Sequence, residues 1–358
     1  MSTVNRKTGL PGRFQLADWI THHQNLAAFL ALAAMLAILP LWVTNNYQRS
    51  ILVFIGFNTM LTVGLSLLMG YTGQISLGHA VFFGCGAYIT GLLTARYNWS
   101  PWPAIVAAAV LTGLLAYLVG VPIFKLRGHY LAMATLGLNI IFETVVVTET
   151  GWTGGSNGLL GIPRLSIGPW VLKSELSYYY VTWAMTLAIL AVSLNIVNSR
   201  VGRALRAIHA SELAAGTMGV EVDAFKLKVL TLSAVYASLA GSLFAFYLQI
   251  VTPSSFSFIF SIELVVMVAV GGLSSIWGAI FGAASVTLLG EALRNIMPRL
   301  VRGASAEAEL LAFGLILVII MIFMPDGLTA GVAKRLRARR QARREAPGRT
   351  EQSADAMP

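Results

Sequence analysis

Two glycine-rich segments contain most of the residues that could handle a polar solute. Residues 70–79 (GYTGQISLGH) combine three glycines with four polar side chains, and residues 271–282 (GGLSSIWGAIFG) interrupt a long apolar run. Irregular polar backbone survives at membrane depth only where protein or a water-filled cavity covers it. The sequence therefore predicts a solute path at Gly73, Gln74, Ser76, Gly78, His79, Gly271, Gly272, Ser274 and Gly278. In a second, equally supported interpretation, the glycines only allow helices to cross closely.

The sequence patterns of the common nucleotide, metal and nucleophile sites do not occur in this chain. It has no G-x-x-x-x-G-K-[ST] phosphate-binding loop and no G-x-S-x-G nucleophile elbow. His22 and His23 are adjacent and the other histidines are isolated, so no pair has metal-ligand spacing. The single cysteine, Cys85, excludes an intrachain disulfide. We therefore expect no catalytic residue, no metal and no cofactor, and no ATP hydrolysis by the chain alone.

A polar stretch at residues 199–228 separates two apolar runs and is longer than a simple connection needs to be. Its apolar residues at helical spacing are Val201, Leu205 and Ile208, and its basic residues near them are Arg200, Arg203 and Arg206. This pattern predicts a short amphipathic helix at the membrane surface that docks onto another protein. The alternative is a basic loop that only fixes the orientation of the neighbouring spans.

The composition is that of an integral membrane protein. Hydrophobic residues make up 56% of the 358 residues and charged residues 11%, with a mean hydropathy of +0.73, whereas soluble domains carry roughly 25% charged residues. The apolar runs predict an all-α polytopic protein of about eight to ten transmembrane helices, with broken or re-entrant helices in both halves. The runs cover residues 26–43, 50–69, 80–95, 102–124, 129–148, 178–198, 229–250, 261–292 and 308–325.

The basic residues predict the orientation of the chain. The segments that would lie in the cytoplasm are residues 1–25, 125–127, 199–228 and the basic tail 327–358. They hold 18 of the 25 Lys and Arg residues, as expected for cytoplasmic loops. Residues 26–326 then form the transmembrane domain, with an external loop at 149–176 and a broken hairpin at 261–292 that starts and ends on one face. Topology and lipid headgroups explain the net charge of +10, so we expect membrane lipid as a partner and no nucleic acid.

Ionisable side chains within the apolar runs are few. Glu143 lies inside one run, and Glu263 and Glu291 lie near the ends of the interrupted run at 261–292. A charged side chain at membrane depth is by default a candidate functional group, but an ion-coupled carrier usually has a denser set of them. The sparseness argues against a self-sufficient secondary transporter, which is the alternative from another functional class.

Several short motifs occur in an order that is similar to one transporter family. Besides the two glycine-rich segments, the chain contains TGGSNGL at 153–159, GRALRAI at 202–208 and ELAAGTMGV at 212–220. Together, over residues 70–290 or so, these motifs resemble the second permease subunit of the branched-chain amino acid ABC importers (the LIV type). The usual I-x-L-P continuation is missing after Val220.

The resemblance implies which other subunits assemble with the chain. Members of this family form half of a membrane channel, together with a second permease subunit, two cytoplasmic ATPase subunits that supply the energy and a periplasmic substrate-binding protein. Residues 199–228 then correspond to the segment that couples the permease to an ATPase, through Arg203, Arg206, Glu212, Ala214, Ala215 and Gly219. The resemblance implies uptake of leucine, isoleucine and valine across a bacterial inner membrane. Related permeases carry urea or other small amino acids and amides, which stay as alternative substrates.

Overall fold

The computed structural model describes residues 12–126, 128–168 and 170–300, together with residues 311, 313–316, 318, 319 and 322. Side chains are described between residues 26 and 296 and at those few later positions. The basic tail predicted at 327–358 and the first residues of the predicted N-terminal segment lie outside the described residues.

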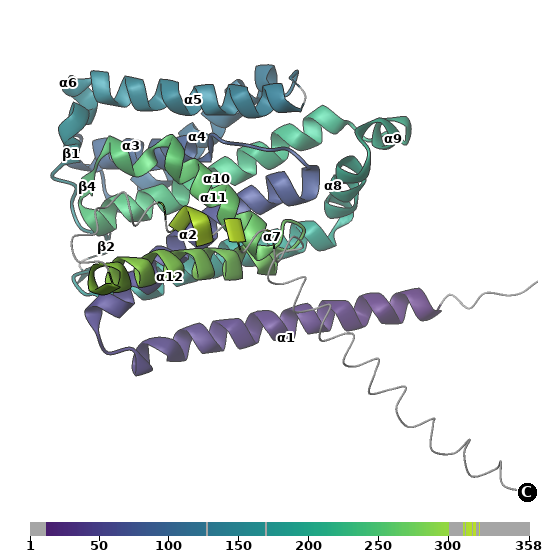
Figure 1. The fold of residues 1–358 in the computed structure, drawn as a ribbon, viewed down its shortest axis with the longest axis horizontal. Helices are drawn as coiled ribbons and strands as arrows, with labels where there is room; N and C mark the ends of the chain where they lie inside the picture. Colours follow the sequence, from purple (N-terminus) through teal and green to yellow (C-terminus); the bar gives the residue numbers. More distant parts are fainter. Residues whose placement is uncertain are drawn as a thin grey trace, which may run out of the picture.

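Helices make up most of the described chain. The longer helices are α1 (Gly12–Trp42), α2 (Asn46–Thr72), α3 (His79–Ala95), α4 (Pro101–Ile123), α5 (His129–Thr148), α7 (Glu175–Asn198), α8 (Arg200–Ala210), α10 (Val222–Leu248), α11 (Phe258–Gly271) and α12 (Ile276–Leu300). The short elements are α6 (Thr150–Thr153), η1 (Gly155–Asn157), β1 (Leu159–Leu160), β2 (Ser166–Ile167), β3 (Trp170–Val171), α9 (Glu212–Thr217), β4 (Ile250–Val251) and η2 (Pro253–Phe256). Most of the long helices lie along one common direction, whereas α8 runs across one end of the bundle (Figure 1). One end of the bundle carries α8 and α9, and the opposite end carries α6, β1 and β4.

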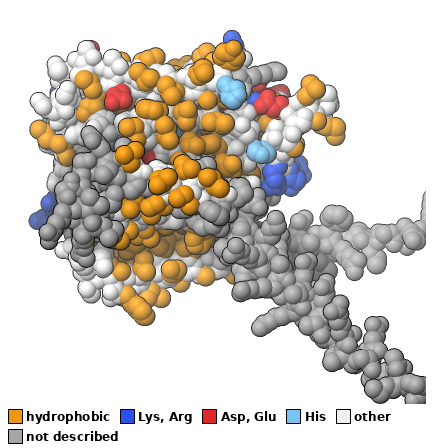
Figure 2. All heavy atoms as spheres, in the orientation of Figure 1, with side chains coloured by type: hydrophobic (Ala, Val, Ile, Leu, Met, Phe, Trp, Pro, Cys, Tyr) orange, Lys and Arg blue, Asp and Glu red, His pale blue; other side chains and the backbone are white. Residues whose placement is uncertain are grey.

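Seven of the described helices are long and apolar enough to cross a membrane. Two shorter apolar helices accompany them, namely α3 and the part of α1 from Leu26 to Trp42. Figure 2 shows hydrophobic side chains over most of the middle of one face, whereas basic side chains gather toward the α8–α9 end. These features confirm an all-α polytopic membrane fold. The apolar run at 308–325 lies largely outside the described residues, so the number of spans stays a prediction.

The helices α2 and α10 form the centre of the bundle, and each is 27 residues long. Gly64 of α2 packs against Ser233 of α10, where an added Cβ would lie 3.3 Å from the Ser233 Cα. α3 also crosses α10 closely, because a Cβ on Gly86 would lie 2.3 Å from the backbone oxygen of Ser238. No side-chain rotation can make room beside a backbone atom in a close-packed interior. The crossing of α3 and α10 therefore requires glycine.

Both central helices end in the same way. Gly73 after α2 and Gln249 after α10 adopt the left-handed conformation, with φ of 72° and 60°. Each is followed by a largely non-helical stretch and then by a shorter helix, α3 with 17 residues and α11 with 14. The sequence predicts the first interruption, within 70–79, but does not single out the second.

The predicted break in the 261–292 run is a tight turn at residues 272–275 between α11 and α12. Glycines bring the two helices together, since a Cβ on Gly282 would lie 1.9 Å from the backbone oxygen of Met267. α12 then runs back along α2. The hydrogen bonds between α2 and this hairpin join Ser66 to Leu273, Thr62 to Ala279 and Asn58 to Thr287. The turn therefore lies beside the C-terminal end of α2.

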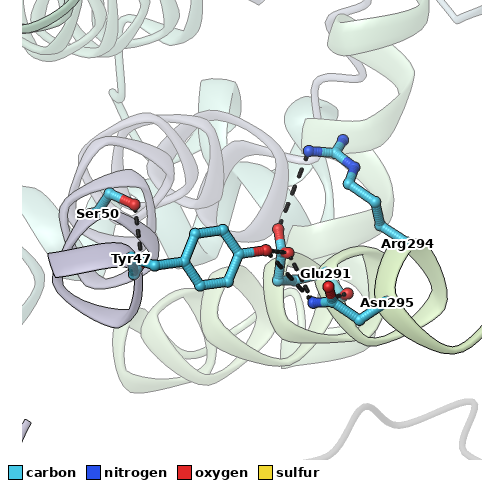
Figure 3. Close-up of polar contacts among 5 residues, drawn as sticks. All are labelled: Tyr47, Ser50, Glu291, Arg294 and Asn295. Carbon is cyan, nitrogen blue, oxygen red and sulfur yellow. Dashed lines mark hydrogen bonds and ion pairs between the residues drawn. The ribbon is translucent and has the colours of Figure 1, made fainter. Parts of the chain in front are cut away.

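Polar contacts join the start of α2 to the C-terminal half of α12 (Figure 3). Tyr47 at the start of α2 donates a hydrogen bond to Glu291 Oε1 of α12, and Asn295 Nδ2 donates to the same oxygen over 3.0 Å. Arg294 Nη1 lies 4.0 Å from the other carboxylate oxygen. Glu291, one of the ionisable candidates in the sequence, therefore ties α12 to α2.

The predicted external loop at 149–176 is a folded unit. Thr153 Oγ1 donates to the backbone oxygen of Val146 over 2.6 Å, which fixes the loop to the end of α5. β1 pairs antiparallel with β4, with Leu159 opposite Val251. Trp152 and Trp170 are exposed, so they are available to anchor the loop in the membrane interface or to contact an external partner.

Candidate functional site

α8 folds back tightly onto the end of α7. The Ser199 hydroxyl accepts a hydrogen bond from the Val201 N–H and caps α8. The buried face of α8 consists of Gly202, Leu205 and Ile208. A Cβ on Gly202 would lie 2.0 Å from the backbone oxygen of Val197 in α7. Of the three apolar residues that the sequence places on one face of this helix, Leu205 and Ile208 are buried against the bundle, whereas Val201 in the first turn is exposed.

The two arginines predicted for coupling differ in their surroundings. Both Arg203 and Arg206 are exposed. Arg206 Nη1 also donates to the backbone oxygen of Val197 over 3.2 Å. That oxygen belongs to the last turn of α7, whose carbonyls have no partner within the helix. Arg206 therefore stabilises the junction between α7 and α8, whereas no hydrogen bond or ion pair of the Arg203 side chain is found among the described residues.

α9 ends in a pair of hydrogen bonds that require a glycine after it. The Val220 N–H donates to the Ala215 oxygen and the Gly219 N–H donates to the Gly216 oxygen, over 3.1 and 3.0 Å. This is the Schellman arrangement, with Gly219 in the left-handed conformation at φ 83°. An added Cβ at Gly219 would meet nothing within 4 Å of this chain. The left-handed backbone conformation at position 219 therefore favours glycine there, independently of any contact with a partner protein.

The outward surface of α9 is apolar. Leu213 is 82% exposed and Met218, directly after the helix, is 85% exposed. Ala214 is also exposed, whereas Ala215 is buried against the bundle. Sequence analysis missed Leu213 and Met218, because a helix of this length has too few turns to show which side faces outward.

Glu212 points back into the bundle. Its Oε1 atom lies 2.6 Å from Nζ of Lys226 in α10, and it accepts a hydrogen bond from Gln74 Nε2 over 3.0 Å. The Lys226 side chain is only 4% exposed, against 39% for Glu212. A residue predicted for ATPase coupling is therefore bonded to a residue predicted for the solute path.

Residues 73–78, called here the 73–78 segment, continue from this contact into the bundle. A Cβ on Gly73 would lie 3.2 Å from His209 Nδ1 of α8. Further along, the Leu77 N–H donates to Thr135 Oγ1 of α5 over 3.0 Å. A small pocket of about 10 Å³ lies beside this segment and is lined by Gln74, Ser76, Gly78, Phe82, Thr135 and Leu138 among others.

Two polar side-chain atoms, one within this segment and one directly after it, are buried without a partner among the described residues. Ser76 Oγ and His79 Nδ1 have no hydrogen bond to any described residue. The other ring nitrogen of His79 lies 3.5 Å from Ser233 Oγ. A buried polar atom without a partner costs free energy, and such atoms are candidates for contact with a passing solute or with water.

The second glycine-rich segment meets the first at the α8–α9 end of the bundle. A Cβ on Gly70 would lie 1.6 Å from the backbone oxygen of Leu273. Gly271 and Gly278 are buried against each other, and Ser274 is exposed in the turn. The close-packing interpretation therefore has direct support at these glycines, while the solute path stays a prediction.

Comparison with known families identifies the architecture. A family described as the permease component of branched-chain amino acid transport systems matches residues 47–324. The chain belongs to this permease family. The match includes both glycine-rich segments, α8 and α9. Members are subunits of ABC transporters, in which ATP hydrolysis is the task of a partner subunit.

Three relatives illustrate the similarity. The high-affinity branched-chain amino acid transport permease LivM of Escherichia coli is 30% identical over 292 residues, which cover 75% of this chain and 67% of that protein. LivM of Salmonella typhimurium is 28% identical over 324 residues, covering 84% and 74%. The permease LivH of Escherichia coli is 23% identical over 289 residues, covering 75% and 90%.

Proposed function

We propose that this chain is one of two permease subunits of an ATP-driven importer of branched-chain amino acids in a bacterial inner membrane. The observation that carries the proposal is the membership of a permease family over residues 47–324. The region that matches includes an apolar helix bundle with a small, outward-facing apolar surface on α9. The LivM relatives support leucine, isoleucine and valine as the substrates.

The energy comes from partner ATPases that dock on α8 and α9. Leu213 and Met218 supply apolar contact area at this surface, and Arg203 adds a positive charge. This end of the bundle then faces the cytoplasm, which agrees with the excess of basic residues in the predicted cytoplasmic segments. The opposite end, with the loop at 149–176, faces the periplasmic binding protein.

A second, homologous permease completes the channel. Both LivM and LivH of Escherichia coli are similar to this chain, and both are named as permeases of a branched-chain amino acid transport system. Residues Gln74, Ser76 and His79 then contribute to the path of the zwitterionic substrate, whose charges need polar partners within the membrane. Backbone N–H groups at the first turns of α3 and α11 can attract the carboxylate without a basic side chain.

Uptake in cells tests the proposal. Deletion of this chain should abolish uptake of radiolabelled leucine, isoleucine and valine, and expression of the full chain should restore it. Vanadate, which blocks ABC ATPases, should stop the restored uptake, whereas an ionophore that collapses ion gradients at constant ATP should not. Loss of urea uptake alone would point to the alternative substrate class. Uptake that follows the ion gradient would identify a secondary transporter.

A further inference from the structure

One carboxylate joins three parts of the fold at the α8–α9 end. Glu212 lies at the start of α9, and its Oε1 atom contacts Lys226 of α10 at 2.6 Å and Gln74 of the 73–78 segment at 3.0 Å. Gln74 Nε2 also donates to the Thr72 oxygen at the end of α2 over 3.1 Å. The Gln74 side chain therefore bridges the end of a central helix and the first residue of α9.

The two partners of Glu212 are held firmly by the bundle. Lys226 lies on α10, a central helix, and its side chain is 4% exposed. Gln74 is 8% exposed, and its backbone N–H is bound to the Leu68 oxygen of α2 over 3.3 Å. Glu212 itself is 39% exposed on a six-residue helix at the surface. A movement of α9 relative to the bundle would stretch the contacts of Glu212 with Lys226 and Gln74.

The 73–78 segment leads from Gln74 to the first turn of α3 over a short distance. Only residues 74–78 separate α3 from the left-handed residue Gly73, and each residue can span at most about 3.6 Å. The segment is fixed in the middle by the bond from the Leu77 N–H to Thr135 Oγ1. Directly beyond it, the Ala80 N–H donates to Ser261 Oγ of α11. Gln74 and Ser76 therefore lie in one short segment that is fixed at Leu77 and leads directly into α3.

α8 touches the same segment independently. His209 Nδ1 would lie 3.2 Å from a Cβ on Gly73, so the imidazole packs against the start of the 73–78 segment. α8 and α9 thus both reach the segment, one by packing and the other through a carboxylate.

We propose that Glu212 is a positioning residue that faces inward and, through Gln74, transmits the movement of α9 to the 73–78 segment and the buried first turn of α3. The inference rests on the proposed function, because it requires that an ATPase moves α8 and α9. It assigns the outward contact with the ATPase to Leu213 and Met218, and the inward contact to Glu212.

The variant Gln74→Met isolates the proposed link. Methionine keeps the length of the side chain but cannot donate to Glu212, and the Glu212–Lys226 pair stays in place. In the complete transport complex, ATP hydrolysis should stay near the unsubstituted rate, while leucine transported per ATP should fall about tenfold or more, as for loss of coupling between two sites. Gln48→Met, the same change at an exposed glutamine near the start of α2, is the matched control and should leave both rates unchanged.

A thiol at Ser76 distinguishes transmission from a simple lining role. In a Cys85→Ala background, Ser76→Cys should react with a small polar thiol reagent at different rates in nucleotide-free and vanadate-trapped complexes. Adding Gln74→Met should remove that difference. A residue that only lines the path would lower uptake but leave the nucleotide dependence of labelling intact.

The two proposals fail in different ways. Without ATP-driven leucine uptake by the unsubstituted complex, the proposed function is wrong. Normal leucine transport per ATP in Gln74→Met, or nucleotide-dependent labelling that persists in it, would overturn the role of Glu212 while leaving the transporter assignment intact.

Discussion

The backbone N–H of Ala80 donates a hydrogen bond to Ser261 Oγ over 3.1 Å, although 181 residues separate them in the chain. Asn139 Nδ2 of α5 donates to the same oxygen over 2.7 Å. The first turns of α3 and α11 therefore meet inside the bundle, and each brings the positive end of a helix dipole. Two interruptions of the helical bundle thus converge on one buried polar region.

The assembled complex, and not this chain, should hydrolyse ATP. The sequence has no phosphate-binding loop. We expect the purified chain in detergent to release no inorganic phosphate from ATP above the buffer background. The complex with its ATPase subunits should release it, and a P-loop lysine substitution in those subunits should stop the release. Robust hydrolysis by the chain alone, insensitive to that substitution, would contradict the proposal.

A side chain at Gly219 should interfere with the partner more than with this chain. An added Cβ meets nothing within 4 Å in the described structure, and Asn tolerates the left-handed conformation better than most residues. Gly219→Asn and Gly219→Asp should therefore both insert normally into the membrane, as measured by immunoblotting of membrane fractions. Both should abolish uptake if the ATPase packs closely at this turn. Unchanged uptake by the Asp variant in an intact complex would refute this contact.

Replacing Glu212 should lower the free energy of unfolding more than replacing Lys226, its partner in the ion pair. Glu212→Gln leaves a buried ammonium without a counter-charge, and we expect a loss of about 3 kcal/mol, the low end for a broken buried pair. Lys226→Met leaves a carboxylate that water reaches, so the loss should be under ~1 kcal/mol. The double variant should be close to Lys226→Met. Denaturant unfolding of the purified chain in detergent measures the three values, and equal losses for the two single variants would contradict this asymmetry.

The crossing of α3 and α10 should not tolerate a larger residue at Gly86. A Cβ there would lie 2.3 Å from a backbone oxygen, so Gly86→Val should destabilise the fold by about 3 kcal/mol, the upper range for overpacking. Gly137→Val on α5 is the matched control, because an added Cβ at Gly137 meets nothing within 4 Å. The thermal stability of both variants in detergent provides the comparison. A similar loss in both would mean that the close approach at Gly86 is not what limits stability.

Cysteines introduced at Ser76 and Ser274, the two serines of the predicted solute path, should react differently with thiol reagents. Ser274 is exposed in the turn between α11 and α12, whereas Ser76 is buried. Ser274→Cys should therefore react with a small polar reagent in every nucleotide state, and Ser76→Cys mainly during turnover. If lipid-soluble probes label both positions while polar reagents never do, these segments face lipid and the proposed path is misplaced.

The sequence predicts features that depend on local composition. The apolar runs, the interruption within 70–79 and the turn at 272–275 are each visible in a short window. By contrast, the contact between Gln74 and Glu212 joins residues 138 positions apart, and no periodicity indicates it. The same limit applies to the exposure of Val201, because the close approach of α8 to α7 at Gly202 is not visible in the sequence.

Pairing of β1 with β4 sets an order of events during synthesis. Leu159 and Leu160 leave the ribosome well before Ile250 and Val251, the residues with which they pair, and α10 must be inserted in between. Until then the loop at 149–176 lacks its partner strand, and the turn at Gly158 lacks the Val251 backbone against which it closes. The surface that would receive the binding protein is therefore finished only when the second half of the chain has been made. A fragment that stops before residue 250 should present this surface in an incomplete form.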